Sequence, residues 1–93
     1  MRFTLFGKRF AVGQIVITQG AYELPQDDVW YGLVRHMAGD WGELCQFDRE
    51  QNDLAVVNGG RLLSQYTTVS GNAFWIITEH DRSVTTILLP SDY

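Results

Sequence analysis

Cysteine and proline are scarce in this chain. Cys45 is the one cysteine among 93 residues, and Pro25 and Pro90 are the two prolines. A lone thiol excludes an internal disulfide and any zinc site built from several cysteines. We therefore expect a protein of a reducing compartment, the cytoplasm. The isolated prolines give no sign of a linker between domains.

Long apolar runs are also missing. The longest uninterrupted one, residues 73–77, has five residues, whereas a membrane-spanning helix needs roughly 20. The amino-terminal sequence MRFTLFGKRF has no continuous apolar core of the kind found in signal peptides. We expect a protein that neither spans a membrane nor carries a cleavable export signal.

Positive charge is sparse and scattered. Seven Lys and Arg residues stand against eleven Asp and Glu residues, which gives a formal net charge of −4. Binding to a phosphate backbone needs a concentrated cationic surface, and no such cluster is visible in the sequence. The acidic excess is in turn too small for a protein that imitates DNA with carboxylates. We therefore expect no direct binding to nucleic acid.

What the chain does have is material for one core. Hydrophobic residues make up 45% of it and aromatic residues 13%, and a chain of 93 residues has too little apolar surface for a second core. We predict a single α+β domain over residues 1–93. It should contain an antiparallel sheet of three to five strands and two main helices, in the order β-α-α-β-β-β.

The first main helix is predicted between Pro25 and Gly39. Proline suits the first helical turn, and Asp27 and Asp28 follow at the end where the helix dipole favours anions. Gly39 supplies the left-handed residue that ends the helix. The expected apolar face consists of Val29, Trp30, Leu33, Val34 and Met37.

A second helix is predicted over DREQNDLAVVNGG, with Asp48 as its N-cap and Gln51 reaching back in a capping box. Asn58 and Gly59 should end it. Its small apolar face would consist of Leu54, Ala55 and Val57, with Phe47 before the cap. We expect this helix to meet the core along one edge.

Three strands are predicted near the carboxyl end, in the segments RLLSQYTTV, AFWIITE and RSVTTILL, with SGN and HD as the turns. The segment GQIVIT is a further strand, and Thr18 at its end can cap a short helical turn. The segment RFTLF, residues 2–6, also has strand character, and its assignment stays open.

The last two strands should form a hairpin. If His80 and Asp81 are a two-residue loop, Glu79 pairs with Arg82. One face of the hairpin then carries Trp75, Ile77, Val84 and Leu88, and the other carries Phe74, Ile76, Ile87 and Leu89. Because neither face is polar, we expect both to be covered. The second face would be covered by a sister subunit in a homodimer or by the amino-terminal segment.

Charged and hydroxyl side chains gather at this hairpin. Glu79 opposite Arg82 would make a cross-strand ion pair, which at an exposed hairpin end needs no functional explanation. The hydroxyls of Thr78, Ser83 and Thr85 would share a face, as a polar patch able to bind a small anion or a carbonyl group. Threonine is, however, simply common in strands.

A second cluster lies in RHMAGDWGELC, residues 35–45. His36 and Cys45 could act as base and nucleophile, but their spacing does not show that they are close. The favoured alternative is a helix stop followed by a turn, in which Trp41 packs on the core and Asp40 caps the next turn.

A ligand site where this loop meets the hairpin is the remaining possibility. Its candidate residues are His36, Asp40, Trp41, Glu79 and Arg82. We expect no metal, because the two histidines lie far apart in the sequence and no compact ligand motif is present. We expect no cofactor either, because the glycines that could cradle a phosphate follow a helix instead of opening one.

Four segments of the chain stand out, GQIVITQGA, RHMAGDWGEL, GGRLLSQY and WIITEHDRSVTTILLPSDY. Together they resemble a family of small bacterial proteins encoded on plasmids and other mobile elements, and the match extends over nearly the whole chain. Members often carry the labels plasmid-related protein or type I restriction enzyme subunit M. The resemblance implies cargo such as integron cassettes or plasmid accessory genes, and it carries over no catalytic residues.

The second label is excluded by the residues. A DNA adenine methyltransferase needs a glycine-rich cofactor loop after a strand and an Asn/Asp-Pro-Pro-aromatic segment, and the chain has neither. The leading hypothesis is a non-enzymatic accessory protein that acts through contacts with a sister subunit or with a protein of the host or the element. The rival is a small-ligand-binding protein or small hydrolase, with its pocket between the GDWG loop and the carboxy-terminal hairpin.

Overall fold

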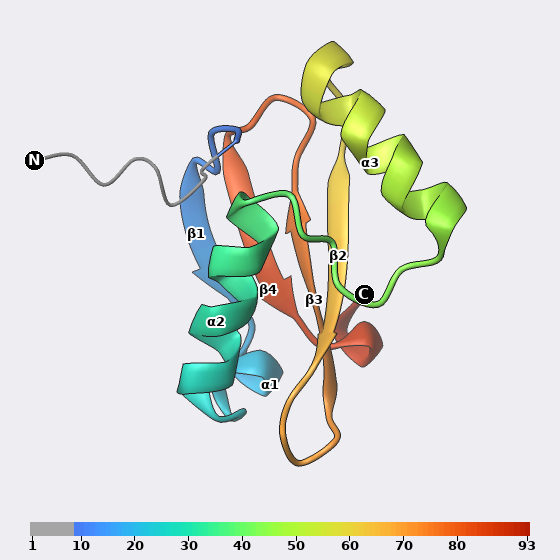
Figure 1. The fold of residues 1–93 in the computed structure, drawn as a ribbon. Helices are drawn as coiled ribbons and strands as arrows, with labels where there is room; N and C mark the ends of the chain where they lie inside the picture. Colours follow the sequence, from blue (N-terminus) through green and yellow to red (C-terminus); the bar gives the residue numbers. More distant parts are fainter. Residues whose placement is uncertain (1–8) are drawn as a thin grey trace, which may run out of the picture.

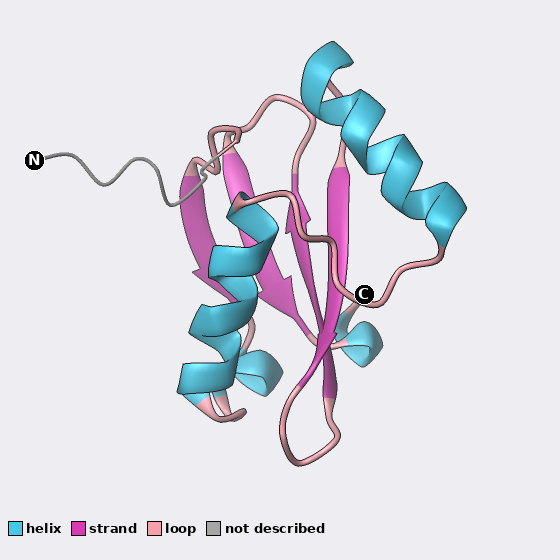
Figure 2. Cartoon of the chain, in the orientation of Figure 1, coloured by secondary structure: helices cyan, strands magenta, loops and turns pink. Residues whose placement is uncertain are grey.

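A computed structural model describes residues 9–93 as one α+β unit (Figures 1 and 2). Four strands form one sheet in the order β1-β4-β3-β2. The strands are β1 (Gln14–Ile17), β2 (Leu62–Thr67), β3 (Ala73–Thr78) and β4 (Val84–Leu88). The helices are α1 (Gln19–Tyr22), α2 (Gln26–Met37) and α3 (Gln46–Asn58), followed after the sheet by the 3-10 turn η2 (Pro90–Asp92). The α+β class is confirmed, and residues 2–6 lie outside the described part.

The sheet is mixed, whereas the sequence suggested an antiparallel one. Strands β2, β3 and β4 form the expected antiparallel meander. Strand β1, however, pairs with β4 in parallel, from Gln14 opposite Val84 to Ile17 opposite Ile87. The apolar pattern of a short strand specifies which side is buried but not which way the strand runs, so the direction of β1 was not encoded locally.

The hairpin between β3 and β4 has a longer loop than predicted. Trp75 lies opposite Leu88 and Thr78 opposite Thr85, a register shifted by two residues from the expected one. The carboxylate of Asp81 accepts bonds from the amide and hydroxyl of Ser83, at 3.0 and 2.6 Å, and thereby stabilises the wider turn. A shift of two residues keeps every side chain on its face, so the predicted division of the hairpin into two faces is confirmed.

Helices α1 and α2 begin and end much as expected. Thr18 caps α1 by accepting the amide of Ala21 at 3.2 Å. Pro25 is the N-cap residue of α2, and Gly39, with φ +83°, follows its C-terminal end. The predicted apolar face of α2 was too wide, because Trp30 and Val34 are 57% and 47% exposed.

Helix α3 departs further from its prediction. It begins at Gln46 after the N-cap residue Cys45, so Asp48 lies in the first turn and the predicted capping box is wrong. Leu54 and Val57, which were expected to face the core, are exposed, and the buried residue of the helix is Asn52. The helix meets the sheet at the edge formed by β2, which agrees with the expected contact along one edge. There the Asn52 side chain bonds to the main chain of Leu63, which an apolar side chain could not do.

The edge of the sheet formed by β2 is covered by polar contacts. The Asn52 side chain donates to the Leu63 carbonyl at 2.8 Å and accepts the Leu63 amide at 3.4 Å. Further along, the Gln65 amide donates to Trp41 O at 3.3 Å, and the Glu43 amide donates to Gln65 O at 2.8 Å. These contacts satisfy main-chain groups that an edge strand otherwise leaves open.

The main core lies between the sheet and helices α1 and α2. Its buried members are Ala21, Val29, Leu33, Tyr66, Phe74, Ile76 and Ile87. A second cluster of Phe10, Val12, Trp41 and Leu62 continues it toward the C-terminal end of α2. The described amino-terminal residues therefore pack on the side of the sheet that the helices cover.

The opposite face of the sheet is covered in part by the carboxy terminus, which the sequence did not suggest. The Tyr93 ring packs against Trp75 with 5.7 Å between centroids. Arg61 donates to the Tyr93 hydroxyl at 2.7 Å and pairs with Glu79 at 3.4 Å. A cover by a sister subunit stays a prediction. Within residues 9–93, no helix has the length and apolar character needed to cross a bilayer.

Candidate functional site

His36 lies at the centre of a buried chain of hydrogen bonds. Its Nδ1 meets the Ser64 hydroxyl, and its Nε2 lies 2.9 Å from Thr78 Oγ1. Thr78 Oγ1 lies 2.7 Å from Thr85 Oγ1, and Thr85 donates to the Val12 carbonyl at 2.7 Å. The side chains in this hydrogen-bond network come from α2, β2, β3 and β4, so they join the helix to three neighbouring strands.

The carbonyl at the end fixes the direction of every bond. Val12 O can only accept, so the Thr85 proton is committed to it, and Thr78 must then donate to Thr85. Thr78 is left as an acceptor for His36 Nε2–H, and Nδ1 accepts the Ser64 proton. His36 is therefore the neutral tautomer protonated on Nε2, with both ring nitrogens occupied.

Burial makes this histidine a poor base. His36 is fully buried, and desolvation lowers its pKa to about 3. Its neighbours are the hydroxyls of Ser64 and Thr78 and the rings of Phe10 and Trp41. With no free nitrogen and no exposure to solvent, His36 serves to connect elements, as a satisfied polar group in the core.

Phe10 brings three of the five predicted site residues together. Its ring centroid lies 5.3 Å from that of His36 and 5.9 Å from that of Trp41, and the Arg82 guanidinium lies 5.8 Å from it. Phe10 was not among the predicted site residues, because it directly follows the turn-prone segment GKR between two candidate strands. The three residues therefore meet through a buried ring.

Asp40 and Glu79 lie apart from that cluster. Asp40 accepts two bonds from Arg35, at 2.8 and 3.2 Å. The hydrogen bond from Arg35 lowers the pKa of the Asp40 carboxyl and raises the pKa of Arg35. Glu79 pairs with Arg61. Each carboxylate thus has its own arginine.

Arg82 does not form the expected ion pair with Glu79. It donates to main-chain carbonyls, with 2.6 Å to Gly60 O and 2.8 Å to Ala55 O. Further bonds at 3.1 and 3.3 Å reach the carbonyls of Glu79 and His80. The longer hairpin loop and the positive φ of Arg82, +62°, turn its side chain toward the end of α3, where helix carbonyls attract a cation.

The predicted polar patch and the predicted pair of nucleophile and base can also be compared with the structure. Thr78 and Thr85 are fully buried, so the predicted polar surface patch is wrong. Cys45 is exposed, whereas both nitrogens of His36 are occupied inside, and the two do not form a nucleophile and base pair. Within residues 9–93, no cluster of three or more His, Cys, Asp or Glu side chains is arranged to hold a metal ion.

The GDWG loop is shaped by its close approach to β2. Gly42 has φ +76°, and a Cβ there would lie 2.0 Å from Gln65 O. Trp41 is buried and donates from its indole to Asp53 at 2.9 Å. The loop therefore acts as a packed strap on the sheet edge, which matches the structural alternative weighed for this segment.

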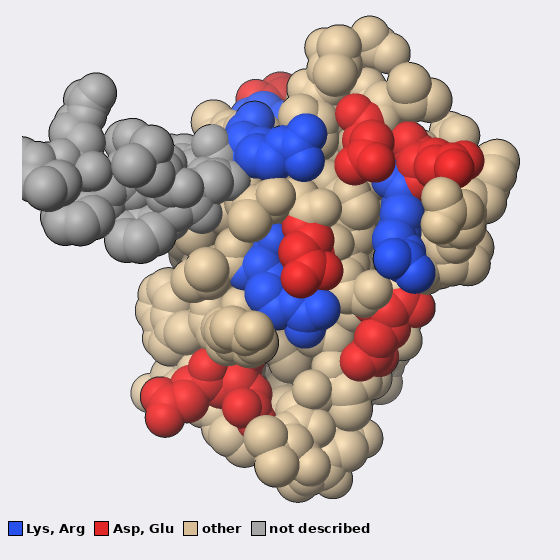
Figure 3. All heavy atoms as spheres, in the orientation of Figure 1, with Lys and Arg blue, Asp and Glu red and all other residues tan. Residues whose placement is uncertain are grey.

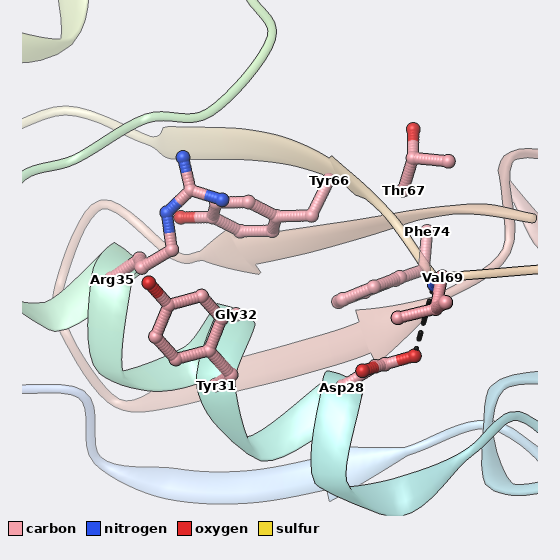
Figure 4. A pocket seen from close by; sticks show the side chains of 8 residues that line it. All are labelled: Asp28, Tyr31, Gly32, Arg35, Tyr66, Thr67, Val69 and Phe74. Carbon is pink, nitrogen blue, oxygen red and sulfur yellow. Dashed lines mark hydrogen bonds between the residues drawn. The ribbon is translucent and has the colours of Figure 1, made fainter. Parts of the chain in front are cut away.

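A hollow of about 200 Å³ lies on the other side of α2, between that helix and strands β2 and β3 (Figure 4). Its lining residues are Asp28, Tyr31, Gly32, Arg35, Tyr66, Thr67, Val69 and Phe74. The Arg35 guanidinium lies over the Tyr66 ring at 4.9 Å and near the Tyr31 ring at 5.8 Å. At the far end, Asp28 accepts the Val69 amide at 3.1 Å.

This hollow offers recognition but no catalytic pair. Tyr66 donates its hydroxyl proton to Asp40 O at 2.6 Å, burial raises its pKa, and Thr67 donates to Glu43 at 2.8 Å. Within residues 9–93, Arg35 has N–H groups beyond the two that bond to Asp40, so the hollow could hold one small acceptor group between two rings. Its volume is below the roughly 300 Å³ at which ordinary ligand pockets begin.

The surface itself offers two further features. On the face drawn in Figure 3, basic side chains lie beside acidic ones instead of forming one cationic area. Helix α3 presents a row of apolar side chains to solvent, with Phe47, Leu54 and Val57 exposed by 65%, 55% and 81%. Their spacing of seven and three residues places them on one side of the helix, and we call them the α3 row.

Comparison with protein-family models, with curated proteins and with solved structures finds no match to this chain. The resemblance to proteins of mobile elements therefore stays a prediction.

Proposed function

We propose that this protein is a cytoplasmic accessory protein of mobile genetic elements that works through protein contacts, as a homodimer, without a catalytic site of its own. Its further partner would be a protein of the host or of the element. The mobile-element context is supported by the sequence resemblance described above. The mode of action is supported by where the side chains lie.

The observation that carries the proposal is the number of large apolar side chains in solvent. The α3 row is one group, and Trp30 and Val34 on α2 are another. Scattered apolar residues are normal on a monomer, but rows on one helix face are typical of interaction surfaces. In contrast, the side chains that first suggested a functional site form hydrogen bonds and ion pairs with other parts of the same fold.

The proposal is tested by measuring the mass of the protein with light scattering over a tenfold dilution series. We expect a species of twice 10.6 kDa at the highest concentration. Dilution should lower the mass toward that of one chain, by mass action. A mass of 10.6 kDa at every concentration would exclude the homodimer.

A screen of small molecules by thermal shift tests the rival function. We expect that no compound raises the melting temperature of the wild type selectively. Any compound that stabilises the wild type should stabilise Arg35→Ala as well. A stabilisation that depends on Arg35, and survives in the Arg35→Lys control, would favour a ligand-binding protein with its site in the hollow beside α2.

A further inference from the structure

Strand β1 is an open edge within the described part of the chain. The strand order places β1 at one end of the sheet and β2 at the other. The β2 edge is covered by Asn52 and by the Trp41–Glu43 segment. Among residues 9–93, no segment pairs with the outer side of β1. Within the described residues, the β2 edge of the sheet is thus covered and the β1 edge is open.

The ladder with β4 shows which groups of β1 point outward. The amides of Gln14 and Thr18 donate to the carbonyls of Ser83, just before β4, and Ile87, each at 3.0 Å. In a parallel pair, alternate residues face the neighbouring strand. Val16 therefore also faces β4, whereas the N–H and C=O groups of Ile15 and Ile17 point away from the sheet. Within residues 9–93, these four groups have no hydrogen-bond partner and can pair with another strand.

In the described part of the chain, the β1 edge carries none of the usual protection. Natural edge strands carry lysine, proline or a bulge that prevents pairing between molecules. Residues 13–19, GQIVITQ, contain neither a charge nor a proline. Ile15 and Val16 are moreover 41% and 40% exposed. Two copies of a chain with net charge −4 meet with least repulsion through such an uncharged surface.

Helix α2 adds apolar area on the same side of the molecule. Its flank with Asp28 and Arg35 faces β2 and β3 across the hollow. Trp30 and Val34 lie on the opposite flank, at 100° per residue, and hence toward the β1 side of the sheet (Figure 1). Ile15 projects to the helix side of the sheet, as Ile17 does, and therefore lies on the same side of the molecule as these two residues.

We propose that β1 pairs with β1 of a second copy in antiparallel fashion about a twofold axis at Val16, which joins two sheets into one of eight strands. This proposal rests on the proposed function and names the surface of its homodimer. The ladder alone is too small for a stable interface of roughly 800 Å² per partner, so Trp30 and Val34 complete the contact.

The register follows from the neighbours of β1. With the axis at Val16, Ile15 of each copy pairs with Ile17 of the other, and both pairs exchange two hydrogen bonds. An axis at Ile15 would need Gly13, whose φ of +63° is not extended, and an axis at Ile17 would need Gln19, which lies in α1. Each alternative leaves half as many bonds.

A charge swap at Val16 tests this geometry. Two Val16 side chains would lie about 5 Å apart across the axis, in a pair without hydrogen bonds. We expect Val16→Asp alone and Val16→Lys alone to have half the mass of the wild type by light scattering. An equimolar mixture should regain the mass of the dimer, which also shows that both variants are folded.

The matched control is the same swap at Val57, in the α3 row. Val57→Asp and Val57→Lys should each keep the dimer mass. Loss of the dimer at Val57 with retention at Val16 would overturn the β1 interface but leave the homodimer standing. A wild type that is monomeric at all concentrations would overturn both.

A covalent trap gives a second measurement that does not depend on charge. In a Cys45→Ser background, Val16→Cys should form a disulfide-linked dimer when oxidised glutathione accepts the electrons of the two thiols, whereas Val57→Cys should not. A Val16→Cys protein that stays monomeric, with its thiol free, would overturn the proposed axis. So would an edge that residues 2–6 of the same chain already cover.

Discussion

His36 joins α2 to three strands through uncharged partners, and protonation would break that arrangement. A proton on Nδ1 would force Ser64 to accept instead of donate, and the buried cation would lose its hydration. The histidine is thus compatible with the fold only in its neutral form. This property makes stability depend on pH.

We predict that the free energy of unfolding falls as the pH is lowered from about 6.5 toward 3. The folded pKa of His36 is about 3, below its ordinary value of 6.5. Between these values the unfolded chain binds a proton that the folded chain does not, so the loss reaches at most roughly 5 kcal/mol and vanishes above pH 6.5. Urea unfolding at several pH values measures it.

The variant His36→Gln should have a flatter pH profile, because glutamine does not titrate. The exposed His80 provides the matched control, and His80→Gln should keep the wild-type slope. Asp40, Asp81 and Asp92, whose pKa values are lowered, add their own losses at lower pH, equally in all variants. Equal slopes in wild type and His36→Gln would contradict this role.

At the same scale, the sequence indicated which residues are unusual but not their partners. Trp41 on the core and the helix stop at Gly39 were predictable from local chemistry. The link of His36 to Thr78 was not, because it spans 42 positions and depends on how α2 crosses the sheet. Arg82 was assigned to Glu79 because the two are close in sequence, whereas the geometry of the loop determined the contact.

Among the elements, α3 shows how an edge contact reverses the usual pattern. Its buried position is taken by Asn52, which pairs with both main-chain groups of Leu63 as a neighbouring strand would. An amphipathic pattern indicates a helix that lies on a sheet face, and it fails for a helix that closes a sheet edge. This is why Leu54 and Val57 were assigned to the core.

We predict that Asn52→Leu lowers the free energy of unfolding by about 1–3 kcal/mol, although it adds an apolar side chain. The Leu63 amide and carbonyl would lose their partners at a nearly closed edge. The control Gln51→Leu changes an exposed neighbour and should change stability by less than about 0.5 kcal/mol. Equal effects in urea unfolding would contradict the edge-closing role.

The strands were predicted well in identity and poorly in pairing. All three carboxy-terminal strands and β1 lie where the alternation indicated. The register of the hairpin depended on one carboxylate, Asp81, which favours a wider loop. The parallel direction of β1 depended on packing between distant segments, which no local pattern records.

On the scale of the whole molecule, both faces of the sheet were expected to be covered, and the structure shows part of the cover of the second face. Tyr93 and Arg61 lie over part of the second face, so the chain supplies some of the cover itself. Much of the exposed apolar surface lies at the β1 edge, on the adjoining flank of α2 and in the α3 row, and Val69 in the loop after β2 is exposed as well. This distribution supports the proposal of a function through protein contacts.

Amide hydrogen exchange at Ile15 and Ile17 tests the proposed assembly most directly. If β1 pairs with a second copy, both amides should exchange as slowly in the wild type as the Thr18 amide, which bonds within the sheet. In Val16→Asp they should exchange rapidly while Thr18 stays protected. Rapid exchange at Ile15 and Ile17 in the wild type at every concentration, or protection that Val16→Asp leaves unchanged, would contradict the account.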